Sequence, residues 1–187
     1  MPFDHFDIIA GFYDRAAQFS PSAALLEALD LHKDFRFLDV GGGTGRVAIS
    51  LRARVREVVV ADVSRGMLRQ AAGKGLSSLC APAEFLPFAS SAFERIFMLD
   101  ALHHVNSQRD TIVELWRVLA PGGRIIIVEP DIHRFAVKLI AVGEKLLLMR
   151  SHFLTWEKIV SLFPQHEAIV RVIHNDFNVI VLGERVR

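Results

Sequence analysis

Residues 35–51 read FRFLDVGGGTGRVAISL and predict a buried strand, a glycine turn and the first turns of a helix. Apolar, β-prone residues come first, four glycines follow between positions 41 and 45, and apolar residues then recur at helical spacing. Glycine allows backbone angles that a Cβ atom forbids, and it lets a ligand approach the main chain closely. Free N–H groups at the start of a helix favour a carboxylate or a phosphate. The turn therefore predicts a nucleoside-type cofactor without identifying it.

The composition is that of one globular domain spanning residues 1–187, with 51% apolar and 23% charged residues. Lysine and arginine number 22 against 21 aspartate and glutamate, which gives no reason to expect nucleic acid or an acidic membrane surface as a partner. We find no secretory signal and no run of the ~18–20 apolar residues that a transmembrane segment requires. Cys80 is the only cysteine, so no internal disulfide is possible. We therefore expect a cytoplasmic protein.

Strand-like and helix-like segments alternate along the chain. Runs of β-prone residues predict seven strands, at 35–40, 57–62, 77–80, 95–102, 124–130, 166–173 and 177–184. The first five alternate with helical patterns, which predicts an α/β fold with a parallel sheet and helices on both faces. The last two are joined through residues 174–176, a spacing that suits an antiparallel hairpin at one edge.

Polar residues mark the expected helix starts. The candidate capping residues are Ser20 (with Pro21 in the first helical position), Ser64, Asn106 or Ser107, and Thr155. Cys80 ends the predicted third strand, and we expect it to be a core residue rather than a catalytic thiol.

Chemically useful residues follow the predicted strands, at the edge where ligands of such sheets bind. They are Gly41–Gly45, Asp62, Ala83–Glu84 and Asp100–His104. Asp62 offers two oxygens to the paired hydroxyls of a ribose; the alternative is a helix cap or a solvated strand end. The dinucleotide pattern G-x-G-x-x-G fails when it is read from Gly41, because Arg46 occupies the position of the third glycine. It fits from Gly43 only with Ala48 as its third member.

Four segments in the correct order resemble class I S-adenosylmethionine-dependent methyltransferases. The resemblance is to the small-molecule type that includes the ubiquinone and menaquinone C-methyltransferases ("methyltransferase type 11"). The segments are LDVGGGTGRVA, VVVADVSRGMLRQA, AEFLPFASSAFERIFMLDALHHV and LAPGGRIIIVEP. This resemblance implies a doubly wound, Rossmann-like sheet of seven strands in the order 3-2-1-4-5-7-6, with S-adenosyl-L-methionine as cofactor.

The resemblance also implies the cofactor-binding residues. Asp62 contacts the ribose, and Met67, Val63, Ala83 and Glu84 lie near the adenine. The methionine carboxylate lies at the turn of Gly41, Gly43 and Gly45, ordered by Asp39, and its ammonium lies near Gly41 and Leu99. FYD at 12–14, with Tyr13, resembles a helix that covers the cofactor.

Pro82 is a departure from this family, which commonly has an aspartate there to bond the adenine amino group. Proline has neither a carboxylate nor an N–H. This departure favours a second hypothesis, a non-catalytic module that keeps the fold and binds the cofactor. A third hypothesis is an NAD-dependent oxidoreductase that uses the Gly43 register.

His104, and His103 as second choice, are the candidate general bases beside the transferred methyl; the alternative is that one packs and the other is solvated. No residue cluster has a metal-ligand spacing, so we expect no metal site. Residues 1–30 are expected to form an N-terminal helical cover. The apolar segment 132–150 is expected to be a lid over a hydrophobic small-molecule acceptor, a homodimer face or an ordinary core helix.

Overall fold

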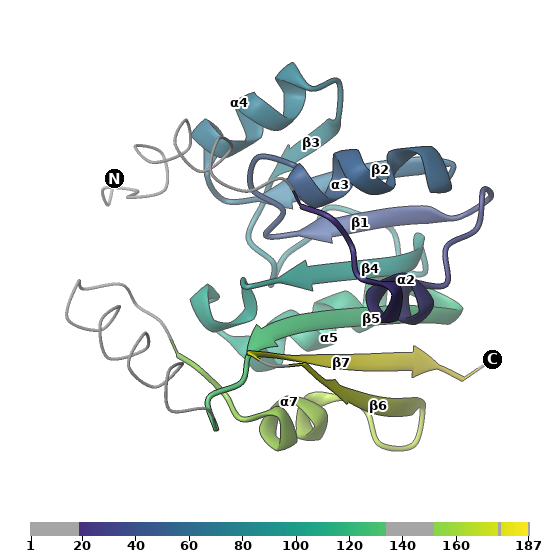
Figure 1. Ribbon diagram of the computed structural model, residues 1–187, viewed down its shortest axis with the longest axis vertical. Helices are drawn as coiled ribbons and strands as arrows, with labels where there is room; N and C mark the ends of the chain where they lie inside the picture. The colour runs from purple at the N-terminus through teal and green to yellow at the C-terminus, as the bar shows by residue number, and fades with distance from the viewer. Residues whose placement is uncertain (1–18, 134–151, 176, 187) are drawn as a thin grey trace.

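A single seven-stranded sheet runs through the computed structural model, in the order β3-β2-β1-β4-β5-β7-β6 (Figure 1). The structure describes residues 19–133, 152–175 and 177–186. The first five strands are parallel, whereas β7 runs antiparallel to both β5 and β6. The predicted strand order and closing hairpin are therefore confirmed. The strands are β1 Arg36–Val40, β2 Glu57–Asp62, β3 Ser77–Cys80, β4 Phe93–Leu99, β5 Leu119–Pro130, β6 Ala168–His174 and β7 Asn178–Arg185.

Helices cover both faces of the sheet, and each face has its own apolar core. The helical elements are α2 Ala23–Leu29, α3 Arg46–Leu51, η1 Arg52–Arg54, α4 Arg65–Gly73, η2 Leu102–His104, α5 Gln108–Val118 and α7 Trp156–Leu162. Residues of α2, α3 and α4 pack in one core, and residues of α5 and α7 pack in the other. Alternate residues of β1 serve the two cores, with Phe37 on one side and Leu38 on the other, because side chains of a strand point to opposite faces in turn.

Three of the predicted helix caps are confirmed and one is wrong. The side chains of Ser64, Ser107 and Thr155 accept hydrogen bonds from the first turns of α4, α5 and α7. Ser22, not Ser20, caps α2, because its backbone is extended and its hydroxyl accepts from the Leu25 N–H at 3.2 Å. Pro21 therefore precedes the helix and does not occupy its first position.

Two strand boundaries differ from those that the hydrophobic pattern predicts. The fourth strand starts at Phe93 and stops at Leu99, since Asp100 has a φ of 50° and turns the chain into η2. The fifth strand begins at Leu119 instead of residue 124. A register shift beside Phe93 absorbs the residues between Leu119 and Arg124, so the Pro-Gly-Gly segment ends α5 and still lies within the strand.

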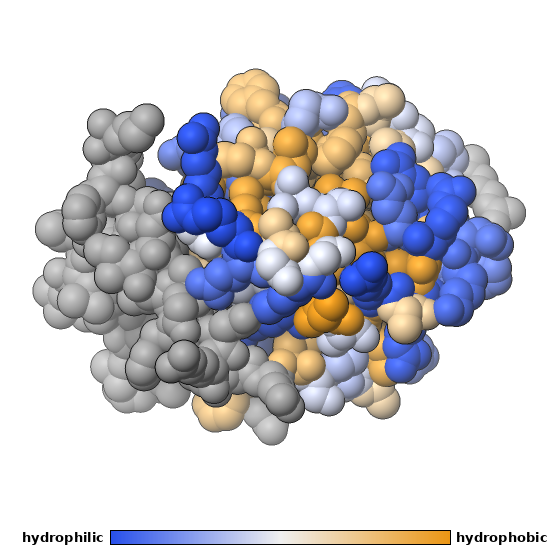
Figure 2. All heavy atoms as spheres, turned by 90° about the horizontal axis from the view of Figure 1, so that it is seen from above, coloured by the Kyte–Doolittle hydropathy of each residue, from blue (hydrophilic) through white to orange (hydrophobic). Residues whose placement is uncertain are grey.

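The prediction that Cys80 is a core residue is wrong, because this residue is exposed. Its strand, β3, forms one edge of the sheet, and both Ser77 and Ser78 are also exposed. Figure 2 views the molecule from this end, where hydrophilic and hydrophobic residues lie side by side. A residue at the end of a short edge strand has a neighbouring strand on one side only, here β2 with Asp62 in register with Cys80.

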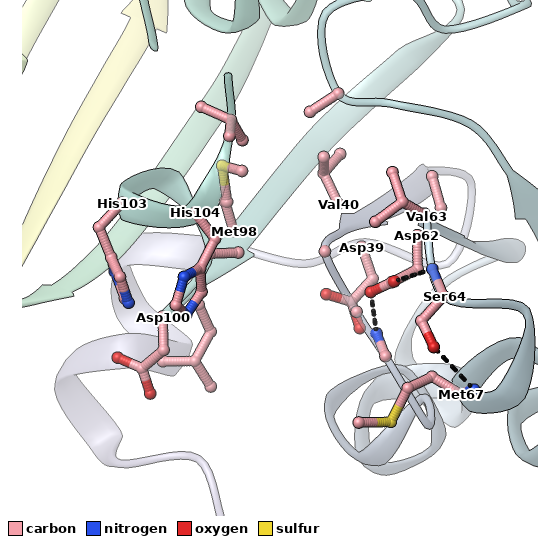
Figure 3. Close-up of a pocket in the computed structure, with 18 of the residues that line it drawn as sticks. Asp39, Val40, Asp62, Val63, Ser64, Met67, Met98, Asp100, His103 and His104 are labelled. Atoms are coloured by element: carbon pink, nitrogen blue, oxygen red, sulfur yellow. Dashed lines mark hydrogen bonds between the residues drawn. The ribbon is translucent and has the colours of Figure 1, made fainter. Parts of the chain in front are cut away.

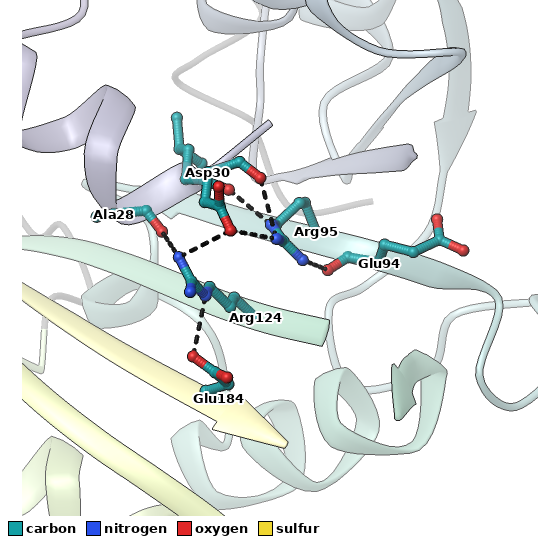
Figure 4. Close-up of polar contacts among 7 residues, drawn as sticks. Ala28, Asp30, Glu94, Arg95, Arg124 and Glu184 are labelled. Atoms are coloured by element: carbon teal, nitrogen blue, oxygen red, sulfur yellow. Dashed lines mark hydrogen bonds and ion pairs between the residues drawn. The ribbon is translucent and has the colours of Figure 1, made fainter. Parts of the chain in front are cut away.

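Two arginines on neighbouring strands hold the end of α2 against the sheet (Figure 4). Arg95 of β4 is buried and donates to the carbonyl oxygens of Leu29 at 2.6 Å and Asp30 at 3.0 Å. Arg124 of β5 bonds Glu184 at 3.0 Å and lies 3.4 Å from the Asp30 carboxylate. The last carbonyls of a helix lack partners within it, so these guanidinium groups anchor α2 at the end of the sheet opposite the glycine turn.

Candidate active site

A cavity of about 730 Å³ opens at the carboxyl ends of β1, β2 and β4. Its volume falls within the ~300–1,000 Å³ that is usual for small-molecule pockets. The glycine turn and the end of β2 form one wall, and the segment that follows β4 forms the other. Figure 3 shows Asp62, Ser64 and Met67 on one side, with Asp100, His103 and His104 across from them. The predicted convergence of strand ends is thus present.

Asp62 ties the end of β2 to the glycine turn. Its Oδ2 accepts from the Gly43 N–H at 2.9 Å, and its Oδ1 accepts from the Ser64 N–H at 2.8 Å (Figure 3). Gly43 has a φ of +53°, and a Cβ there would point toward Met67 and Asp62 with nothing closer than 3.8 Å. The main chain at Gly43 is therefore open to a ligand beside a half-buried carboxylate.

Gly45 differs from the other turn glycines, since it is buried and does not line the cavity. Its φ is +73°, and an added Cβ would lie 2.4 Å from a methyl carbon of Leu76. Gly45 therefore lets α3 pack against the end of α4, whereas Gly41 and Gly43 face the cavity.

Asp39 is buried under the glycine turn with only 1% of its surface exposed. Its Oδ2 has no hydrogen-bond partner in the part of the chain that the structure describes. Burial raises the pKa of the carboxyl to about 7, the nearby Asp62 raises it further, and the Ala48 N–H and Arg46 oppose the rise. A Cβ at Gly42 would lie 2.6 Å from its carboxyl carbon, so the missing side chain at Gly42 makes room for this carboxyl group.

The predicted adenine-side residues also line the cavity: Met67 and Ala83 are buried, and Val63 is 64% exposed. Leu99, which was predicted near the ammonium, lines it as well and is half-buried. The Oε1 atom of Glu84 accepts from the N–H groups of Asn106 at 2.8 Å and Ser107 at 3.0 Å. One carboxylate oxygen of Glu84 therefore holds the start of α5.

His103 and His104 differ sharply in their surroundings, although both line the cavity. His103 is 3% exposed, and its Nδ1 lies 2.5 Å from Oε2 of Glu129. The other oxygen of Glu129 accepts from the N–H groups of Ala101 at 3.0 Å and Leu102 at 2.8 Å. His104 is half-buried. The structure thus fixes the orientation of His103 more firmly than the sequence analysis anticipated.

Three contributors to this wall were missed from the sequence. Glu129 is the last residue but one of the predicted strand 124–130, and an acidic residue near the end of a strand, as Asp62 is, was a usable signal. The Phe153 ring stacks on His103 with centroids 4.3 Å apart, and Phe177 in the β6–β7 turn lines the cavity and is 64% exposed. Nothing local in the sequence indicates that either phenylalanine reaches this cavity.

Some predictions fall outside the described residues. This group contains Tyr13, most of the N-terminal cover 1–30 and nearly all of segment 132–150. The roles of these residues stay predictions, and the homodimer stays a prediction too. No helix within 19–133, 152–175 and 177–186 is both long enough and apolar enough to cross a membrane. Within those same ranges, no three His, Cys, Asp or Glu side chains are grouped to hold a metal ion.

Comparison with known proteins points to one family. The methyltransferase domain family matches residues 38–127. The chain is 38% identical over 124 residues to the biotin biosynthesis bifunctional protein BioHC of Cellvibrio japonicus, a match that covers 63% of this chain and 25% of that protein. It is 39% identical over 99 residues to a demethylmenaquinone methyltransferase of Clavibacter sepedonicus, which covers 50% of this chain and 40% of the relative.

Solved structures of methyltransferases share the fold of this chain. A solved S-adenosylmethionine-dependent methyltransferase from Aquifex aeolicus matches with a TM-score of 0.75 and 20% identity, over 98% of this chain and 100% of that chain. The chain spans less than half the length of the curated relatives described above.

Proposed function

We propose that the chain transfers a methyl group from S-adenosylmethionine to a small, rather apolar acceptor, as expected of the class I S-adenosylmethionine-dependent methyltransferases that its sequence and fold resemble. One observation carries the proposal: a single cavity holds Asp62 and the glycine turn on one wall and an oriented histidine on the other. A module that only binds the cofactor needs the first wall, with Asp62 and the glycine turn, but not the oriented histidine.

The residues of the first wall fit the donor. Asp62 accepts one backbone N–H group at each carboxylate oxygen, and because such an oxygen can accept more than one hydrogen bond, this carboxylate suits a ribose diol. The open main chain at Gly43 suits the amino-acid part of the donor. The buried Oδ2 atom of Asp39, which no described residue bonds, suits a nearby ammonium, because an adjacent cation stabilises the charged form of a carboxyl group.

The donor supplies a methyl group on a positively charged sulfur, which is already a good leaving centre. The protein therefore has to orient the acceptor and exclude water, and good orientation can lower the barrier by up to ~7–11 kcal/mol. Phe153 and His103 contribute to a partly apolar wall. At the other end, Asp62 and Met67 fix the nucleoside. We propose that His103 rather than His104 accepts a proton from the acceptor, since the Glu129 carboxylate lies 2.5 Å from the Nδ1 atom of His103 and orients its ring.

A ring-bearing acceptor of quinone or phenol type suits this wall best. It presents aromatic side chains from Phe153 and Phe177, and one relative is named as a demethylmenaquinone methyltransferase. BioHC is named for biotin biosynthesis, so phenolic, quinone-like, amine and carboxylate acceptors all belong in the assay.

Calorimetry with S-adenosylhomocysteine and with NAD tests the cofactor first. We expect binding of S-adenosylhomocysteine only; binding of NAD instead would overturn the family-based proposal. Comparing S-adenosylhomocysteine with its analogue lacking the ribose hydroxyls, in wild type and in Asp62→Ala, isolates the ribose contact. The analogue should bind more weakly to wild type and show no such loss in the variant.

Methyl transfer from labelled donor separates the enzyme from the second candidate, a non-catalytic binding module. Pro82, which lines the cavity, favours that candidate because it has no side-chain carboxylate and no N–H to bond the adenine. Tight binding of S-adenosylhomocysteine without transfer to any of the four acceptor types would support the module.

A further inference from the structure

Resting on the proposed methyl transfer, we infer that Glu129 is a positioning residue that holds His103 as a proton acceptor, and that the methylated atom of the acceptor carries a hydrogen, as a phenol oxygen does. No family motif in the sequence assigned Glu129 a role. The inference rests on three contacts of one buried carboxylate and on the cavity that His103 lines.

All three contacts of Glu129 are to one turn. One oxygen accepts from the Ala101 and Leu102 N–H groups, where η2 begins, and the other faces Nδ1 of His103 at 2.5 Å. A carboxylate oxygen accepts hydrogen bonds, so the ring hydrogen lies on Nδ1 and Nε2 is the nitrogen that takes up a proton. Glu129 thereby selects the tautomer of His103.

The ring is held from several sides. Phe153 stacks on it at 4.3 Å and 14°, and the His104 ring lies 4.0 Å away. The His103 carbonyl accepts from the His152 N–H at 2.7 Å. The Gln108 side chain donates to the carbonyls of both Leu102 and His152. A base whose orientation is fixed in this way is the arrangement that nucleophile activation requires.

Bonds, electrons and protons balance in the proposed methyl transfer. The lone pair of the acceptor atom forms a bond to the methyl carbon, and the carbon–sulfur bond breaks with its electron pair moving to sulfur. The acceptor hydrogen passes as a proton to Nε2 of His103. The positive charge that leaves sulfur reappears on the imidazolium, next to the Glu129 carboxylate, so the net charge of the cavity does not change. Burial strengthens this compensation because the local dielectric is low.

Nitrogen NMR of the histidine rings tests the tautomer without an acceptor. In wild type with S-adenosylhomocysteine, the His103 signal, assigned by its loss in His103→Asn, should show its hydrogen on Nδ1. In Glu129→Gln the amide oxygen can still accept from Ala101 and Leu102, which places the amide NH₂ toward Nδ1 and moves the ring hydrogen to Nε2. A hydrogen on Nε2 in wild type, or the same tautomer in both proteins, would overturn the inference.

Kinetics with two probe acceptors tests the role. Naphthol loses a proton on methylation, whereas dimethylaminonaphthalene does not. Glu129→Gln should lower kcat for naphthol by at least about 10²-fold, with KM and the Kd of S-adenosylhomocysteine within about twofold of wild type. Transfer to the tertiary amine should be unaffected. Equal slowing of both acceptors would refute the assignment. If wild type methylates neither probe acceptor, the NMR measurement of the His103 tautomer alone decides whether the inference holds.

Two further variants distinguish positioning from loss of structure. Glu114→Gln removes a carboxylate that accepts from the Leu86 N–H at 2.7 Å and bonds Arg117, away from the cavity. It should leave both kcat and the His103 tautomer unchanged. Glu129→Gln combined with His103→Asn should be no slower than His103→Asn alone, because residues that act as a unit are not additive. If wild type fails to bind S-adenosylhomocysteine, the proposed function fails; if binding persists but the tautomer is wrong, only this inference fails.

Discussion

Asp39→Asn tests the electrostatics of the site, because burial raises the pKa of this carboxyl from its ordinary 3.8 to about 7. Asparagine has nearly the same size but never ionises. Between these two pH values the unfolded chain has released the proton and the folded protein still holds it, so stability falls as the pH rises. The stabilisation is fully present below pH 3.8 and is lost as the pH rises through about 7.

The magnitude follows from that interval. A pKa rise from 3.8 to about 7 corresponds to about 4 kcal/mol at about 1.4 kcal/mol for each pH unit. The free energy of unfolding of Asp39→Asn, minus that of wild type, should therefore grow with pH between 4 and 7 and then level off, on top of a constant offset for the amide.

Urea unfolding followed by circular dichroism, at pH 4 to 8 in steps of one unit, measures this difference. Glu27→Gln is the control, since Glu27 is exposed on α2, and its difference should change far less with pH than that of Asp39→Asn. A flat difference for Asp39→Asn would refute the argument that the buried carboxyl is neutral in the folded protein at low pH.

The same carboxyl links ligand binding to protons. A bound ammonium near Asp39 lowers the pKa of its carboxyl, so binding of S-adenosylhomocysteine at pH 6 should release protons. Calorimetry in two buffers with different ionisation enthalpies measures the release, which should disappear in Asp39→Asn. Proton release that is equal in both proteins would place the ammonium elsewhere.

Three stability predictions follow from packing and capping, all measured by urea unfolding. Gly45→Ala should cost about 2 kcal/mol or more, because φ is +73° and the new Cβ meets Leu76; a cost below about 0.5 kcal/mol would contradict this packing. Ser107→Ala should cost about 1 kcal/mol through loss of the cap of α5, and no loss would mean that the hydroxyl is replaceable by water. Arg95→Met should cost about 3 kcal/mol, because it leaves the buried Leu29 carbonyl without its donor; a neutral result would show that α2 does not depend on this contact.

Local patterns in the sequence were sufficient to predict the strands, the parallel sheet and the closing hairpin, and the family resemblance supplied the strand order. The glycine turn, Asp62 and the alternation of strands and helices each depend on neighbouring residues, and parallel topology then brings the strand ends together. The errors came from the same local reasoning. Ser20 and Ser22 are both of a residue type that caps helices, and only the backbone geometry shows that Ser22 caps α2. Cys80 reads as buried until the sheet order makes its strand an edge.

Long-range contacts account for what the sequence could not predict. The His103–Glu129 pair joins residues 26 positions apart, and the Asp62 carboxylate bonds Gly43 from 19 positions away. Gly45 looked like the other site glycines, and only the packing of Leu76 against it separates them. The rings of Phe153 and Phe177 reach the cavity from segments far along the chain.

The described residues on either side of segment 134–151 are held by hydrogen bonds to the rest of the fold. Before it, the Asp131 N–H donates to the Phe177 carbonyl at 2.8 Å. After it, the His152 N–H donates to the His103 carbonyl at 2.7 Å. An engineer who exchanges this segment for another therefore starts and finishes at defined anchors beside the acceptor wall. Such chimaeras would show whether this segment selects the acceptor, because Asp62 and the glycine turn stay unchanged.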